Sequence, residues 1–220
     1  MLRLEFHCHT IYSKDCLVRV ETLLETCQRK GIERIVITDH NTAAGAFQAQ
    51  KIDPQRVIVG EEILTQQGEL LVAFLKEEIP AGLPAMETIK LLREQGAFIS
   101  VSHPFDELRN GHWLEQDLVN ILPYIDAIEI FNARCMSNEY NNRAADFAKK
   151  YQLAGTVGSD AHATFEIGRA AMLLPDFQDA ESFKAAMQDA EFETRLSSPL
   201  VHFTSRYAVM YKKIFNPQVP

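Results

Sequence analysis

The sequence lacks the features that mark several large classes of protein. Its 220 residues contain no run of about 18 apolar residues, so no transmembrane helix is expected. The four cysteines are scattered and form no CxxC pair, which favours free thiols in a reducing compartment over a disulfide framework. The formal net charge is −8, with 22 basic and 30 acidic residues, so a broad basic face for nucleic acid is not expected.

The sequence also contains no low-complexity segment, linker or Gly-rich phosphate loop. It begins MLRLEFHCHT, without the apolar core of a secretory signal, which predicts a cytoplasmic protein. Hydrophobic residues make up 46% of the sequence and charged residues 24%, so there is enough apolar material for a full core. A chain of this length suits one domain with a small appendage.

Short apolar runs alternate with helical patterns along most of the chain. Strands are predicted over residues 2–6, 34–38, 57–59, 69–75, 97–101, 127–131, 154–157 and 170–174, where 69–75 is a hairpin partner or an extra strand and 170–174 a last strand or an edge piece. Helices are predicted over 20–30, 43–50, 84–95, 114–121, 138–151, 179–189 and 204–215. This alternation indicates βαβ units and a parallel sheet, and about seven such units predict an α/β barrel. We expect the barrel domain over residues 1–196 and a helical C-terminal extension, packed on it, over residues 197–220.

Unusual polar residues follow the predicted strands at their carboxyl ends. They are His7 and His9, Asp39 and His40, Glu61 and Glu62, His103, Asn132, and Asp160 and His162. In a parallel barrel these strand ends converge on one mouth, where active sites lie, so we expect the side chains to meet in space.

The residue types then select the chemistry. Histidine with Asp or Glu is a ligand set for Zn²⁺, Mn²⁺ or Fe²⁺. In His7-x-His9 both rings point to the same side, because strand side chains alternate with a period of two, and Asp160-x-His162 repeats this geometry. A carboxylate such as Glu62 can bridge two ions, and a centre of two or three ions suits hydrolysis of phosphate esters.

Each of these signals taken singly also fits a structural role, such as a polar turn or a histidine that ends a strand. The joint pattern, with five of the seven histidines at predicted strand ends, favours a metal centre. His112 and His202 lie outside the pattern, and we expect them at the surface or in packing. Trp113 is likewise expected to pack rather than to contact substrate.

The ordered motifs His7-Cys8-His9-Thr10, Thr38-Asp39-His40-Asn41, Gly60-Glu61-Glu62-Ile63, Ser102-His103-Pro104 and Gly158-Ser159-Asp160-Ala161-His162 resemble those of the PHP (polymerase and histidinol phosphatase) superfamily. The resemblance spans about residues 1–175. It implies a distorted (β/α)7 TIM-like barrel, two or three divalent metal ions as cofactors, and hydrolysis of phosphomonoesters or phosphodiesters.

The resemblance also implies residue roles. It assigns His7, His9, Glu62 and Asp160 to a first metal, Glu62 and His103 to a second, and Asp15, His40 and His162 to a third. Glu62 is preferred over Glu61 because the family pattern reads Gly-x-Glu before an apolar residue. The sequence departs from the family at Asn132, where a further histidine is common, and this weakens the predicted second site.

Other residues are assigned by their position beside these motifs. Asp39 is expected to orient a metal ligand. Arg134, with Asn132 beside it, is the main candidate for contact with substrate phosphate, and Lys14, Arg19 and Arg109 are lesser ones. Asp160 is expected in the catalytic centre, and His40, His103 or a metal-bound water would protonate the leaving group.

Three functions fit the sequence. The first is a phosphoesterase that hydrolyses a small phosphorylated metabolite or nucleotide with a metal-activated water. The second is a nuclease or a 3′,5′-bisphosphate nucleotidase, limited to short oligonucleotides by the acidic balance. The 40 residues between Glu62 and His103 leave little room for the inserted cap that such proteins often carry. The third is a non-catalytic module that binds metal or a ligand. No membrane partner is expected.

Overall fold

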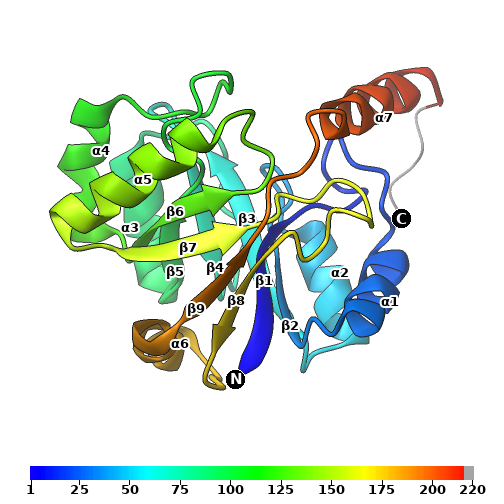
Figure 1. Cartoon of the computed structure of the whole chain (residues 1–220), viewed down its shortest axis with the longest axis horizontal. Coiled ribbons are helices and arrows are strands. Elements are labelled where there is room, and N and C mark those ends of the chain that lie inside the picture. Colours follow the sequence, from blue (N-terminus) through cyan, green and yellow to red (C-terminus); the bar gives the residue numbers. More distant parts are fainter. Residues whose placement is uncertain (216–220) are drawn as a thin grey trace.

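A computed structural model describes residues 1–215 and contains nine strands and seven α-helices within that range (Figure 1). The last five residues of the predicted extension, 216–220, lie outside the described part. The strands are β1 (Leu2–Cys8), β2 (Arg34–Ile37), β3 (Val57–Leu64), β4 (Glu69–Ala73), β5 (Phe98–Val101), β6 (Ala127–Asn132), β7 (Ala154–Gly158), β8 (Ala170–Leu174) and β9 (Glu191–Thr194). The helices are α1 (Val20–Lys30), α2 (Ala44–Ile52), α3 (Ala85–Gln95), α4 (Glu115–Ile121), α5 (Asn138–Tyr151), α6 (Ala180–Ala186) and α7 (Val201–Phe215).

Local sequence signals explain where several helices begin and end. α1 and α3 end at Gly31 and Gly96, both in the left-handed conformation that glycine adopts without steric cost. Ser137 caps α5 by accepting a hydrogen bond from the backbone nitrogen of Glu139. Asp179 and Ser182 form a reciprocal capping box at the start of α6.

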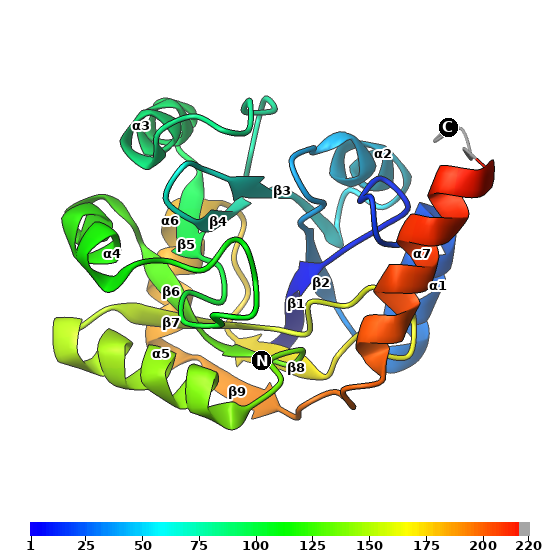
Figure 2. The same cartoon turned by 90° about the horizontal axis from the view of Figure 1, so that it is seen from above.

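The strands form one sheet in the order β7-β6-β5-β4-β3-β2-β1-β8-β9. β1, β2 and β3 are parallel, and so are β5, β6 and β7. A parallel bridge between Cys8 and Ala161 brings the segment after β7 back to β1, so the sheet curls into a nearly closed barrel. Figure 2 shows helices α1 to α5 arranged around the outside of this sheet. The predicted distorted α/β barrel is confirmed.

Several details differ from the prediction. The sheet is not wholly parallel, because β8 runs antiparallel to β1 and β4 runs antiparallel to β3 and β5. The pairing of β4 with β3 is the hairpin expected as one alternative for residues 69–75. β3 continues to Leu64, so Glu61 and Glu62 lie inside the strand rather than after it. β9 was missed because its four residues are all exposed and carry no apolar alternation. α7 begins at Val201, three residues earlier than expected.

One end of the barrel is closed by aromatic side chains. Phe183 from α6 stacks on Phe6 from β1 with ring centroids 5.7 Å apart and meets Phe98 from β5 edge-on at 4.8 Å. All three rings are buried. Because this end is filled with apolar groups, polar side chains of the same strands collect at the opposite end, as is usual in barrels of this kind.

Helix α7 lies at the end of the barrel opposite α6 (Figure 1). The ammonium group of Lys212 donates hydrogen bonds to the carbonyl oxygens of Ile11 and Ser13, which ties the helix to the loop after β1. Trp113 packs as expected: it is 2% exposed and donates from Nε1 to the carbonyl oxygen of Glu69 at 2.9 Å. Within residues 1–215, no helix is long and apolar enough to cross a bilayer.

Candidate metal centre

The polar end of the barrel brings together side chains from six segments. β1 and the residue after it supply His7 and His9, and their Nε2 atoms lie 3.2 Å apart. A close approach of β7 to β1 permits this arrangement, since a Cβ at Gly158 would lie only 2.2 Å from the Cβ of His7. The remaining predicted ligands come from the loops after β1, β2, β5 and β7 and from β3: they are Asp15, His40, Glu62, His103, Asp160 and His162.

The four residues assigned to a first metal converge. Oδ1 of Asp160 lies 3.1 Å from Nε2 of His9 and 3.6 Å from Nε2 of His7, and Glu62 lies 3.5 Å from the latter atom. All four side chains are fully buried. Within residues 1–215, Oδ1 of Asp160 and Oε2 of Glu62 accept no well-formed hydrogen bond. Buried carboxylate oxygens aimed at imidazole nitrogens fit a divalent cation held by N and O donors.

The three residues assigned to a third metal also converge. Oδ2 of Asp15 lies 3.4 Å from Nε2 of His162 and 3.5 Å from Nε2 of His40. Ring nitrogens of His9, His40 and His162 lie within 4.8 Å of one another, so His9 stands between the two groups of ligands. This donor set also fits a cation.

The two residues expected to hold a second metal, Glu62 and His103, have a neighbour that the sequence does not indicate. Nε2 of His103 lies 3.1 Å from Oε1 of Glu62, as expected, but it also lies 3.4 Å from Oε2 of Glu69, the first residue of β4. Atoms of His40, Glu62 and Glu69 come within 4.8 Å of one another. Only the antiparallel pairing of β3 with β4 places Glu69 here, and no motif in the sequence indicates it.

Asn132 does not take the position of a ligand. It is 1% exposed, and its Nδ2 donates to Oε2 of Glu129 at 3.1 Å and to Oδ2 of Asp160 at 3.2 Å. Because the amide nitrogen is a donor and faces two carboxylates, its role here is to hold those carboxylates in place.

Buried partners orient the ligands. Asp39 accepts hydrogen bonds from the backbone nitrogen and hydroxyl of Thr10, both at 2.6 Å, and from the hydroxyl of Ser13 at 2.7 Å. The Ser13 hydroxyl lies 3.1 Å from Nδ1 of His9. Asp39 therefore acts on His9 through Ser13, which is the kind of support that metal-binding histidines usually have.

Electrostatics keep the carboxylates of Glu62 and Asp160 ionised. Burial alone would raise the pKa of Glu62, but the charges of His7 and His40 hold it well below its usual range. Likewise, Arg109 and His7 outweigh burial and hold the pKa of Asp160 well below its usual range. Ionised carboxylates in a closed pocket are the form that binds a cation.

The predicted cationic residues are placed very differently. Nη2 of Arg109 lies 2.6 Å from Oδ2 of Asp160, so this lesser candidate touches the centre directly. Lys14 and Arg19 are exposed. The guanidinium of Arg134 is 3.1 Å from Oε2 of Glu166, and its Nη2 donates to the carbonyl oxygen of Val201 and the hydroxyl of Ser205.

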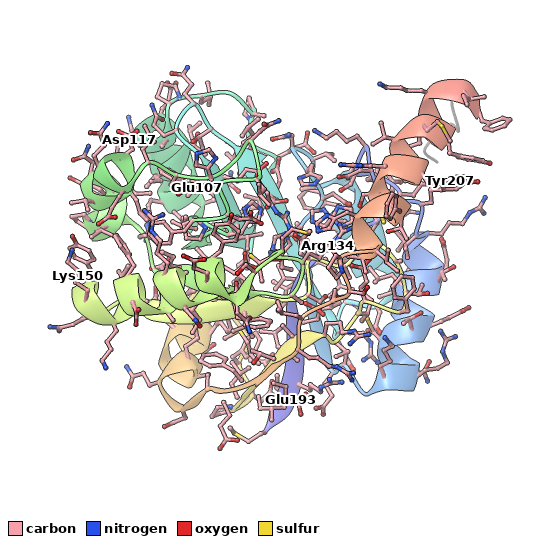
Figure 3. All side chains as sticks on the ribbon, turned by 45° about the horizontal axis from the view of Figure 1, so that its top comes forward. Glu107, Asp117, Arg134, Lys150, Glu193 and Tyr207 are labelled. Carbon is pink, nitrogen blue, oxygen red and sulfur yellow. The ribbon has the colours of Figure 1, made fainter. Side chains whose placement is uncertain are left out.

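Arg134 is therefore bound by protein groups of both the barrel and α7, and its contact with substrate stays a prediction. Figure 3 places it in the interior beside the start of α7, whereas Tyr207 lies on the outer face of that helix. Arg134 is only 4% exposed, but it borders a cavity above these residues.

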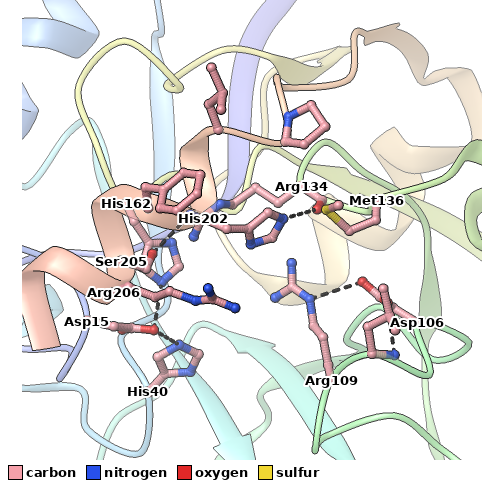
Figure 4. Close-up of a pocket in the computed structure, with 14 residues that line it drawn as sticks. Asp15, His40, Asp106, Arg109, Arg134, Met136, His162, His202, Ser205 and Arg206 are labelled. Atoms are coloured by element: carbon pink, nitrogen blue, oxygen red, sulfur yellow. Dashed lines mark hydrogen bonds and ion pairs between the residues drawn. The ribbon is translucent and has the colours of Figure 1, made fainter.

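A cavity of about 670 Å³ opens above the centre (Figure 4). Asp15, His40 and His162 border it on the metal side. His202 and Arg206 from α7 border it as well. His202 is partly exposed, and its Nε2 lies 3.1 Å from the carbonyl oxygen of Arg134, which agrees with the expected place at the surface or in packing. His202 is the second residue of α7, and its local sequence gives no sign that it borders the cavity. Its position there depends on how α7 docks onto the barrel.

Comparisons with known proteins agree with these observations. Residues 5–104 match the family model described as the PHP domain, and residues 138–191 match one described as PHP-associated. The uncharacterized protein MJ0417 of Methanocaldococcus jannaschii is 39% identical over 173 residues, which cover 77% of this chain and 69% of the relative. A protein of Caldicellulosiruptor bescii named a probable phosphatase is 26% identical over 200 residues, covering 76% of this chain and 83% of that protein.

Solved structures share the fold at low sequence identity. One is a two-domain protein from Bacteroides vulgatus described as containing a predicted PHP-like metal-dependent phosphoesterase, with a TM-score of 0.70 at 17% identity over 94% of this chain and 69% of that one. Another is PsfC from Pseudomonas syringae, with a TM-score of 0.66 at 18% identity over 98% of this chain and 100% of that one.

Proposed function

Because the chain belongs to the PHP domain family, we propose that it is a metal-dependent phosphoesterase that hydrolyses a small phosphorylated metabolite or nucleotide. The observation that carries the proposal is the convergence of His7, His9, Glu62 and Asp160, in which buried carboxylate oxygens without well-formed hydrogen bonds face imidazole nitrogens. The similarity to a probable phosphatase supports the reaction class.

We further propose that the centre holds two or three divalent ions. His7, His9, Glu62 and Asp160 would hold the first, and Asp15, His40 and His162 another. Glu62 and His103, together with Glu69, would hold the remaining one. Zn²⁺, Mn²⁺ or Fe²⁺ bound in these positions would supply an activated water and take up charge on the phosphoryl oxygens.

The residues of the chain contribute binding and proton transfer. Arg109 stands at the border of the cavity and of the centre, where its guanidinium balances the charge of Asp160 and attracts an anionic substrate. Of the two histidines expected to protonate the leaving group, only His40 borders the cavity, whereas His103 is 3% exposed and lies deeper. His40 is therefore the better-placed proton donor of the two, in the form of the centre with two ions, in which His40 holds no metal.

Metal analysis followed by an activity panel tests the proposal. The purified protein is loaded with Mn²⁺ or Zn²⁺ and its bound metal is counted by mass spectrometry. It is then assayed with phosphomonoesters, a 3′,5′-bisphosphate nucleotide and a short RNA. We expect bound metal and release of phosphate from the monoesters. Hydrolysis of the RNA alone would instead identify a nuclease, and tight metal binding without any turnover would identify a binding module.

Two variants then connect the activity to the centre. We expect His9→Ala and Asp160→Ala to lose metal and hydrolysis together, because each removes a buried donor. Asp146→Ala, at an exposed position of α5, is the matched control and keeps both. Wild-type hydrolysis by either centre variant would contradict the metal assignment.

A further inference from the structure

Part of the wall of the cavity is apolar and exposed to solvent. It carries Leu108, Met136, Leu200 and Phe203, which are 68%, 46%, 69% and 63% exposed. Single exposed apolar residues are common on protein surfaces, but a group that borders one cavity marks a binding surface. Phe203 lies on α7 and Leu200 directly precedes it, so the wall is built jointly by the barrel loops and by the C-terminal helix.

A positively charged side chain, that of Arg206, also borders the cavity, close to the predicted metal ligands. Arg206 lies one turn after Phe203 on α7, and Figure 4 shows its side chain pointing into the cavity between Asp15 and Arg109. Arg109 is paired with Asp160 and Arg134 with Glu166. Within residues 1–215, no carboxylate pairs with Arg206. Its guanidinium is therefore available to an anion in the cavity.

Two contacts hold α7 in place, so the positions of Phe203 and Arg206 are set by the protein. Near the start of the helix, Nη2 of Arg134 donates to the carbonyl oxygen of Val201 at 2.8 Å and to the hydroxyl of Ser205 at 2.9 Å. Near its end, Lys212 is bonded to the loop after β1. A helix fixed at both ends presents a pre-organised surface, which lowers the entropic cost of binding.

We propose that the cavity selects phosphate monoesters whose organic part is aromatic or otherwise apolar. Arg206 binds the phosphate oxygens. Phe203 of α7 and Leu200, which precedes the helix, cover the organic part together with Leu108 and Met136. A guanidinium matches phosphate through paired hydrogen bonds, and an aromatic ring offers Phe203 a stacking partner. The cavity volume of about 670 Å³ suits a ligand of this size. This inference rests on the proposed phosphoesterase function.

The first test compares two esters that differ only in the character of the alcohol. 2-Phenylethyl phosphate and glycerol 1-phosphate both release a primary alcohol, so the chemical step has a similar intrinsic barrier. We expect kcat/KM to favour the phenylethyl ester by about 10-fold or more, which is the discrimination that an apolar pocket provides. We expect Phe203→Ala to reduce this preference by about 10-fold. Met210→Ala, an exposed apolar residue further along α7 that does not border the cavity, leaves the preference unchanged.

The cation is tested separately. Arg206→Gln should raise KM for both esters by about 10-fold, because it removes a charge-assisted contact to phosphate. Lys213→Gln, an exposed basic residue on the same helix, is the matched control. Circular dichroism should show unchanged helix content in all four variants, since Phe203 and Arg206 are exposed side chains.

A binding measurement separates this inference from the proposed function. Titration calorimetry with the non-hydrolysable 2-phenylethylphosphonate should show tighter binding than with ethylphosphonate, and Phe203→Ala should remove the difference. If neither ester is hydrolysed but this pattern of binding holds, the proposed activity fails and the selectivity of the cavity stands. Equal kcat/KM for the two esters, unaffected by Phe203→Ala, would overturn the selectivity and leave the activity standing. Phe203→Ala could instead convert a dimer into a monomer and leave the ester preference unchanged. That result would show that a second copy of the chain covers this surface, and it would also overturn the proposed selectivity.

Discussion

Oε1 of Glu129 lies 2.8 Å from Nδ1 of His7, and both side chains are buried. With Nδ1 donating to this carboxylate, Nε2 of His7 is left to face the metal centre. The other oxygen of Glu129 accepts from the backbone nitrogen of His103 at 2.8 Å and from Nδ2 of Asn132 at 3.1 Å. One carboxylate from β6 therefore sets the orientation of a ligand on β1 and the position of the loop that carries another ligand.

We expect Glu129→Gln to weaken metal binding by about 10–100-fold, because the partner that fixes the tautomer and angle of His7 is lost. Competition with a chelator of known affinity measures the change. Glu191→Gln, at an exposed position on β9, is the control and should bind metal as the wild type does. Unchanged affinity in Glu129→Gln would show that His7 needs no such support.

Glu69→Gln should remove one ion per chain or weaken its binding by about 10-fold or more, because the amide is a much poorer ligand than the carboxylate. Counting bound metal by mass spectrometry over a range of free metal concentrations gives this result without reference to activity. Glu87→Gln on the exposed face of α3 serves as the comparison. The role of Glu69 is rejected if both variants bind the wild-type number of ions with wild-type affinity.

Arg134→Ala should lower the free energy of unfolding by about 3–5 kcal/mol, because it leaves Glu166 buried without its ion-pair partner. It should also speed amide hydrogen exchange in residues 201–215, whose helix loses two hydrogen bonds to the guanidinium. Arg195→Ala, which removes an exposed guanidinium, should change the free energy by no more than about 0.5 kcal/mol. Wild-type urea unfolding of Arg134→Ala would contradict this account.

Glu61 gives a prediction about pH. Its side chain is fully buried, and burial raises its pKa from 4.5 to about 8. Between those values the folded state holds a proton that the unfolded state has released, so the stability contributed by Glu61 is complete below about pH 4.5 and is lost as the pH rises through about 8. Within this range the contribution of Glu61 to the free energy of unfolding falls by up to about 1.4 kcal/mol per pH unit. Glu61→Gln should remove this part of the slope.

Urea unfolding of the chelator-treated protein at several pH values measures the effect. The difference between the wild type and Glu61→Gln isolates the contribution of this residue from those of the other titratable groups. Glu87→Gln provides the baseline, since its side chain is exposed. Parallel pH profiles for the wild type and Glu61→Gln would show that Glu61 ionises normally.

Much of the centre could be predicted because its ligands stand next to strands. His7, His9, His40, His103, Asp160 and His162 follow apolar runs in the sequence, and the convergence of parallel strand ends is a general property of barrels. Glu62 lies inside β3 rather than after it, because the strand continues to Leu64. The motif Gly60-Glu61-Glu62-Ile63 nevertheless predicts it as a metal ligand. Glu61, one residue earlier, points to the other face of the strand and is buried away from the ligands.

The residues that were missed depend on contacts between segments far apart in the chain. Glu69 joins the centre only because β4 turns back antiparallel to β3. Glu129 sits inside an apolar strand, where an acidic residue gives no sign of its partner 122 positions away. In the sequence, Phe203 and Arg206 fit the ordinary amphipathic pattern of a helix. Their place at the cavity follows only from the position of α7 in the folded protein.

The order and spacing of polar residues after apolar runs predicted the fold class and the residues that converge in the candidate metal centre, because local periodicity decides which face of a strand is buried. Tertiary structure decided how the charges are paired. In the folded protein Arg109 pairs with Asp160, Arg134 pairs with Glu166, and Arg206 faces the cavity. The physical reason is that ion pairs and cavity walls depend on distances across the barrel, and these arise only when the sheet curls and the last helix docks.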